Sequence, residues 1–150
     1  MAMNVRAEGA TARRMRSRRE VSGLDYLRAL RQLAGSMTQV ELARSVGVTQ
    51  PAISAALKSA AKVSEPRAGF SGADPYEIAQ RYAAGDLGRD QVIDELARWD
   101  CRPGRPTDGY DWTTGDVGEF NEMVGKALDD GLLEPDTYDA ILDRRDELGP

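Results

Sequence analysis

The fold is decided by residues 38–60, TQVELARSVGVTQPAISAALKSA, in which two short helices are expected to meet at a tight turn. Thr38 and Thr49 each stand where a hydroxyl can accept a hydrogen bond from the first turn of a helix. Gly47 suits the left-handed conformation that often ends a helix, and Pro51 suits the first turn of the next one. We therefore expect one helix that ends at Gly47 and a second from Gln50 to about Ala60.

Apolar spacing indicates which faces of these helices are buried. A preceding helix is expected from Ser22 to Ala34, with Ser22 as its N-cap, because leucines recur there every three residues. Gly35 ends that helix. The side chains expected to face inward are Leu24, Leu27, Leu30 and Leu33 in the first helix, Val40, Leu42, Ala43 and Val46 in the second, and Ile53, Ala56 and Leu57 in the third.

The pattern Gln39-x3-Ala43-x3-Gly47-Val48-x4-Ile53-Ser54 resembles the helix-turn-helix of the Cro and lambda-repressor class, often called the Xre family. Ala43 is small where two helices cross, Gly47 permits the turn, and Val48 and Ile53 are expected to fill the wedge between the helices. The resemblance covers residues 22–62, and it implies a DNA-binding domain over residues 22–67. A small helical bundle that shares this spacing by chance is the alternative.

The resemblance also implies which side chains contact DNA. The third helix becomes a recognition helix in the major groove, where the amide of Gln50 can pair with adenine through two hydrogen bonds. Gln39 is the residue that contacts a phosphate and braces Gln50. Thr49, Ser54 and Ala55 are candidates for base or phosphate contacts, and Lys58 is a candidate for the DNA backbone. Ordinary exposed helix surface is the alternative for these four.

Charge divides the chain. Residues 1–67 contain 12 Lys and Arg against five Asp and Glu, a net charge of +7, and residues 68–150 have eight against 20, a net charge of −12. We expect residues 1–21 to form a basic N-terminal arm that adds phosphate or minor-groove contacts; a solvated, frayed tail is the alternative. The arginines concerned are Arg13, Arg14, Arg16, Arg18 and Arg19.

Residues 74–150 repeat one helical pattern. Asp74 can cap a helix that ends at Gly85, and a second helix follows from Arg89 to Trp99. The pattern returns 46 residues later, with Gly131 in the place of Gly85 and Leu133 in the place of Leu87. Each unit is too small to bury its apolar face alone, so the two hairpins are expected to pack on one another or on a partner.

A linker rich in Pro and Gly joins the hairpins. Tyr110 and Trp112 are its large apolar residues, and they either anchor the linker on the hairpins or contact a protein partner, because Tyr and Trp are enriched at binding hot spots. The spacing of Asp108, Asp111 and Asp116 does not fit a calcium-binding loop. The sequence thus predicts an all-α fold: a helix-turn-helix bundle followed by two helical hairpins.

Composition excludes several kinds of chemistry. The chain has no His and one Cys, Cys101, so a structural zinc site, a nucleophile paired with His and an intrachain disulfide are excluded. We expect no enzyme activity, no metal and no cofactor. Neither an export signal nor an apolar run of ~18 residues is present, which predicts a cytoplasmic protein that does not bind a membrane.

These observations predict a sequence-specific DNA-binding transcriptional repressor that acts as a homodimer on a double-stranded DNA operator. The acidic half predicts capture of a basic protein partner. With a toxin as that partner, the protein is an autoregulating antitoxin of a toxin-antitoxin system. A repressor of a phage or mobile element and a protein-interaction adaptor without DNA binding are the alternatives.

Overall fold

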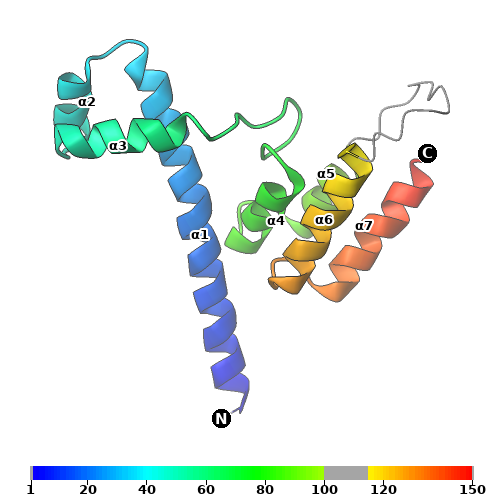
Figure 1. Ribbon diagram of the computed structural model, residues 1–150. Coiled ribbons are helices and arrows are strands. Elements are labelled where there is room, and N and C mark those ends of the chain that lie inside the picture. Colours follow the sequence, from blue (N-terminus) through cyan, green and yellow to red (C-terminus); the bar gives the residue numbers. More distant parts are fainter. Residues whose placement is uncertain (1, 100–114, 150) are drawn as a thin grey trace, which may run out of the picture. The chain divides into compact units, whose positions relative to one another are not determined.

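The structure is a computed structural model that describes residues 2–99 and 115–149, with side chains described over residues 8–99 and 119–149. Every element of the described residues is a helix, which confirms the predicted all-α class (Figure 1). The helices are α1 (Ala2–Ala34), α2 (Gln39–Val46), α3 (Gln50–Ala60), α4 (Pro75–Ala84), α5 (Arg89–Arg98), α6 (Gly115–Asp129) and α7 (Pro135–Glu147).

The chain forms two compact units. Residues 19–65 form the α2–α3 unit, and residues 1–18 together with 66–150 form the hairpin unit. Helix α1 begins at Ala2, not at Ser22, so the segment expected to be a basic arm, with a frayed tail as the alternative, is helical. Straight-chain and small residues fill that segment, including Ala2, Ala7, Ala10 and Ala12, and these favour a helix over a frayed tail. Ser22 is an exposed residue inside α1 and caps no helix.

The core of the α2–α3 unit is small. Leu30, Leu42, Ala43 and Ile53 are buried in it, and Ala34, Met37, Ala56 and Leu57 pack against them. Four residues expected in the core are exposed instead, namely Leu33, Val40, Val46 and Val48, by 37% to 57%. Leu24 and Leu27 are half-buried. Successive helical residues are turned by about 100°, so Val40 lies almost opposite Leu42 and cannot share its buried face.

Two arginines of α1 fasten the chain after α3. Arg28 is buried and donates from Nε and Nη2 to the carbonyl oxygen of Ser64, at 3.1 and 2.8 Å. Arg31 donates to the carbonyl oxygens of Ala60 and Val63 and pairs with Glu65. Ala60 is the last residue of α3, and Val63 and Ser64 lie in the segment after it, so these guanidinium groups hold that segment against α1. The unit is thereby closed without a further helix.

The hairpin unit consists of two similar helix pairs in one core. Gly85 ends α4 with φ 89° and Gly131 follows α6 with φ 77°. The core holds Ile78, Leu87, Val92 and Leu96 from the first pair and Phe120, Val124, Leu133 and Ile141 from the second. Helix α4 packs on α6 and α5 packs on α7, so equivalent helices of the repeat face each other. Of the two arrangements expected from the sequence, packing on one another or on a partner, the described residues have the first.

Polar side chains tie the segment before α4 to the hairpins. Glu77 is buried, pairs with Arg81 at 2.8 Å and accepts a hydrogen bond from the Ala73 amide at 3.1 Å. Glu95, also buried, accepts from the hydroxyl of Ser71 at 2.8 Å. A buried carboxylate is stable only when it is paired in this way. Residues 71–73 are therefore held against the first hairpin.

Two tyrosines join the hairpins to each other. The Tyr76 hydroxyl donates to Asp130 at 2.6 Å, and the Tyr82 hydroxyl donates to Glu134 at 2.7 Å. Burial and these carboxylate acceptors raise the pKa of both tyrosines. The hydrogen bonds from Tyr76 and from Lys126 in turn lower the pKa of Asp130. Both bonds cross between α4 and the turn after α6, where they fix the register of the two hairpins.

Candidate nucleic-acid interface

The turn between α2 and α3 has the geometry that the sequence predicts. Thr38 caps α2 by accepting from the Glu41 amide, and Thr49 caps α3 by accepting from the Ala52 amide, both at 3.2 Å. Gly47 has φ 84°, and its amide donates to the carbonyl oxygen of Ala43 at 2.9 Å. The Val48 amide donates to the same oxygen at 3.0 Å. This pair of bonds closes α2 and turns the chain directly into α3.

Gln39 and Gln50 meet across this turn. Gln39 is the first residue of α2 and Gln50 is the first residue of α3, and both side chains are exposed. Gln50 Nε2 donates to Gln39 Oε1 at 3.1 Å. An amide has two N–H donors and one carbonyl acceptor. The contact with Gln39 takes one donor, so one N–H and the Oε1 of Gln50 form the donor–acceptor pair that adenine N7 and N6 require.

The other candidate residues on α3 differ in exposure. Thr49, Ala55 and Lys58 are exposed, whereas Ser54 is half-buried. Gln50, Ser54 and Lys58 follow one another at a spacing of four and lie along one stripe of the helix. The hydroxyl of Thr49 is already the acceptor of the helix cap. The stripe thus presents one amide, a partly covered hydroxyl and one ammonium group.

The positive charge of residues 1–67 is shared between the two units. The α2–α3 unit, residues 19–65, has six Lys and Arg against four Asp and Glu, a net charge of +2. Two of those cations, Arg28 and Arg31, are engaged with carbonyl oxygens of the same unit. Of the net charge of +7 in residues 1–67, +4 therefore belongs to residues 1–18, which group with the acidic hairpins.

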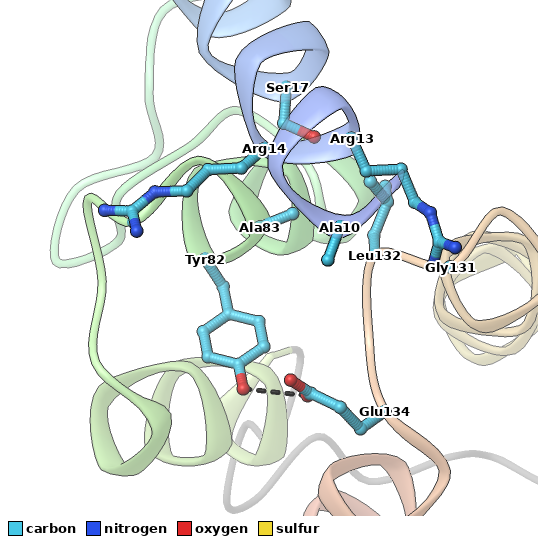
Figure 2. Close-up of a pocket in the computed structure, with 10 residues that line it drawn as sticks. Ala10, Arg13, Arg14, Ser17, Tyr82, Ala83, Gly131, Leu132 and Glu134 are labelled. Carbon is cyan, nitrogen blue, oxygen red and sulfur yellow. Dashed lines mark hydrogen bonds between the residues drawn. The ribbon is translucent and has the colours of Figure 1, made fainter. Parts of the chain in front are cut away.

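The arginines expected in the basic arm are divided between the units. Arg19 is exposed in the α2–α3 unit. Arg13, Arg14, Arg16 and Arg18 belong to the hairpin unit, where Arg18 Nε donates to the carbonyl oxygen of Ala84 at 3.1 Å. Arg13 and Arg14 line a pocket between α1 and the hairpins (Figure 2). The opposite net charges of residues 1–18 and residues 66–150 are the sequence signal that could have indicated this intramolecular role.

Tyr110 and Trp112, the candidate partner-binding residues, lie outside the described residues, as do Cys101, Asp108 and Asp111. Within the described part of the chain, no helix is long and apolar enough to cross a membrane. Comparisons with protein-family models, with curated proteins and with solved structures find no match to this chain.

Proposed function

We propose that the protein is a sequence-specific DNA-binding regulator, most simply a repressor that binds its operator as a dimer. Helix α3 is the recognition helix, and its first residues face the base edges in the major groove. The observation that carries this proposal is the hydrogen bond from Gln50 to Gln39 on the exposed first turns of α3 and α2. An exposed amide held in one orientation costs less conformational entropy when it pairs with a base.

The two glutamines contact different parts of the DNA, Gln50 a base and Gln39 a phosphate. Gln50 directs its second N–H and its Oε1 to adenine, while the Nε2 of Gln39 donates to a phosphate oxygen. Thr49 and Ala55 flank the contact, and Lys58 supplies a charge for the DNA backbone. The modest charge of the unit means that base contacts, more than counterion release, determine where the protein binds.

The acidic hairpin unit supports a second part of the proposal, capture of a basic protein. Residues 66–150 contain nine Lys and Arg against 20 Asp and Glu, a net charge of −11, and the whole unit, with residues 1–18 included, has a net charge of −7. Complementary charge speeds association with a cationic partner, and a toxin with a basic surface is such a partner. The protein would then be an antitoxin that binds its own promoter.

An adaptor without DNA binding is the second candidate. It is favoured by the exposure of Val40, Val46 and Val48, by 57%, 37% and 40%, in α2 and in the turn after it. Exposed apolar groups of this kind serve protein contacts better than contacts with a phosphate backbone. The net charge of +2 points the same way.

Selection of duplexes from a random pool separates the candidates, because a regulator enriches one sequence at physiological salt and an adaptor enriches none.

Gln50→Ala then tests whether Gln50 contacts a base of the selected duplex. One bidentate pair is worth about 1–3 kcal/mol, so we expect preference for the selected site to fall about 5- to 150-fold while non-specific affinity changes little. Gln32→Ala, on an exposed position of α1 in the same unit, is the matched control. Equal losses of specific and non-specific binding would contradict the assignment.

A further inference from the structure

One face of α1 lies over the turns that follow α4 and α6. Ala10, Arg13, Arg14 and Ser17 are spaced by three, four and seven residues and so share this face. They line one side of a pocket of about 440 Å³. The opposite side is lined by Tyr82, Ala83, Gly85, Gly131, Leu132 and Glu134. Ala10 and Ser17 are small, which lets the helix approach the turns, and Ser17 is 4% exposed.

The two turns under α1 are equivalent positions of the repeat. The amide of Asp86 donates to the carbonyl of Arg81, and the amide of Leu132 donates to that of Ala127, both at 2.9 Å and both across five residues. Each turn follows the C-terminus of a helix and is therefore at the negative end of a helix dipole. Two such ends side by side attract cations.

Arginines of α1 occupy both ends. The guanidinium of Arg14 lies against Gly85, and Arg13 lies against Gly131, where a Cβ would be 3.2 Å from Arg13 Nη1. Arg18 donates to the last carbonyl of α4. Adjacent helical residues project about 100° apart, which lets two consecutive arginines reach two separate turns. Figure 2 shows Arg13 and Arg14 pointing to opposite sides of α1, with Arg13 directed at Gly131.

We propose that these turns form a recognition surface for an arginine-bearing helix, and that residues 10–18 of the same chain are its occupant. We call this surface, made by residues 82–85 and 131–134, the glycine-turn face. Gly85 and Gly131 both have a positive φ, which favours glycine, and a Cβ at either position would also crowd an arginine of α1. Charge supports the match, because residues 1–18 carry five Arg and one Glu, a net charge of +4, against −11 for residues 66–150.

This surface gives the basic segment a role inside the protein in place of one on DNA. A guanidinium engaged with a helix C-terminus is withdrawn from phosphate contacts. An outside partner that fits the glycine-turn face is a helix with two consecutive arginines flanked by small residues, and such a partner competes with α1.

Hydrogen exchange of the full-length protein tests whether the arginines hold α1. In the variant R13A/R14A/R18A we expect the amides of residues 8–18 to exchange about tenfold faster, because three charge contacts with helix ends are lost. The control variant R19A/R44A/K62A removes three exposed cations of the other unit and leaves these rates unchanged. Wild-type exchange rates in R13A/R14A/R18A would overturn the proposal.

Binding in trans tests the surface itself. A fluorescent peptide of residues 8–21 is added at low salt, where exposed charge contacts are weakly screened, to wild-type protein and to R13A/R14A/R18A. We expect the peptide to bind the variant, whose own segment is released, at least about tenfold more tightly than wild type. Equal binding to both proteins, including binding to neither, would overturn the proposal. Neither experiment contains DNA, so their outcome is independent of the proposed regulator function.

Discussion

Replacing Gly85 by Ala tests how the end of α4 is built. Gly85 has φ 89°, and a Cβ at this position would lie 2.9 Å from Cζ of Arg14. The left-handed conformation costs a non-glycine residue about 1–2 kcal/mol, offset by about 0.4–1 kcal/mol from a more restricted unfolded chain. Displacing the Arg14 guanidinium from the helix end costs a further amount of about 0.3–1 kcal/mol. We expect the free energy of unfolding of the hairpin unit to fall by about 1.5 kcal/mol.

Urea unfolding followed by the fluorescence of Trp99 measures this change. Trp99 is buried in the core of the hairpin unit, and a Trp112→Phe background makes it the single indole of the chain. Gly47→Ala is the matched control, since Gly47 has φ 84° but lies in the other unit, where a Cβ would meet nothing within 4 Å. Gly47→Ala should leave the urea midpoint of the Trp99 transition unchanged.

A double-mutant cycle isolates the contribution of the arginine. In an Arg14→Ala background, Gly85→Ala should cost about 1 kcal/mol, because the backbone strain remains while the displaced guanidinium is already absent. If the cost of Gly85→Ala is the same with and without Arg14, the guanidinium does not lie on the turn in solution, and the account of this contact is refuted.

Three further outcomes are expected. Lys58→Ala should reduce the slope of log K against log salt for DNA binding by about 1, whereas the triple alanine variant of α1 should leave that slope unchanged. Glu77→Ala leaves the guanidinium of Arg81 buried without its main charge partner, and urea unfolding should show a loss of about 3 kcal/mol. Burial, followed by the hydrogen bond to Glu134, raises the pKa of Tyr82, so its contribution to stability is complete below pH ~10 and is lost as pH rises through the folded pKa. Tyr82→Phe should therefore flatten the fall of unfolding free energy with pH above ~10.

Local capping chemistry made much of the fold predictable. Thr38, Thr49 and Asp74 cap the helices that the sequence assigns to them, and Gly47 and Gly85 end helices in the left-handed conformation. Each of these signals depends on one side chain and the backbone within one turn. The all-α class and the packing of the hairpins followed from the same short-range patterns.

Tertiary context decided what local patterns left open. The apolar residues in the N-terminal half of α1 are mostly alanines, which mark no strong buried face in the sequence, and the partners of this segment lie more than sixty residues away. Val40 and Val46 are apolar residues, but α2 buries only the face that holds Leu42 and Ala43, and both valines lie outside it. The contact between Gln50 and Gln39 was expected from the resemblance, and its use on DNA stays a prediction.

The most direct test of the central claim is a double-mutant cycle on Gln39 and Gln50, read as the ratio of affinities for the selected duplex and for one with the contacted adenine replaced. We expect Gln50→Ala to reduce this ratio about 5- to 150-fold and Gln39→Ala to reduce it less. Adding Gln39→Ala to Gln50→Ala should change the ratio little, because Gln39 acts on the base through Gln50. A ratio that Gln50→Ala leaves at the wild-type value would contradict the claim.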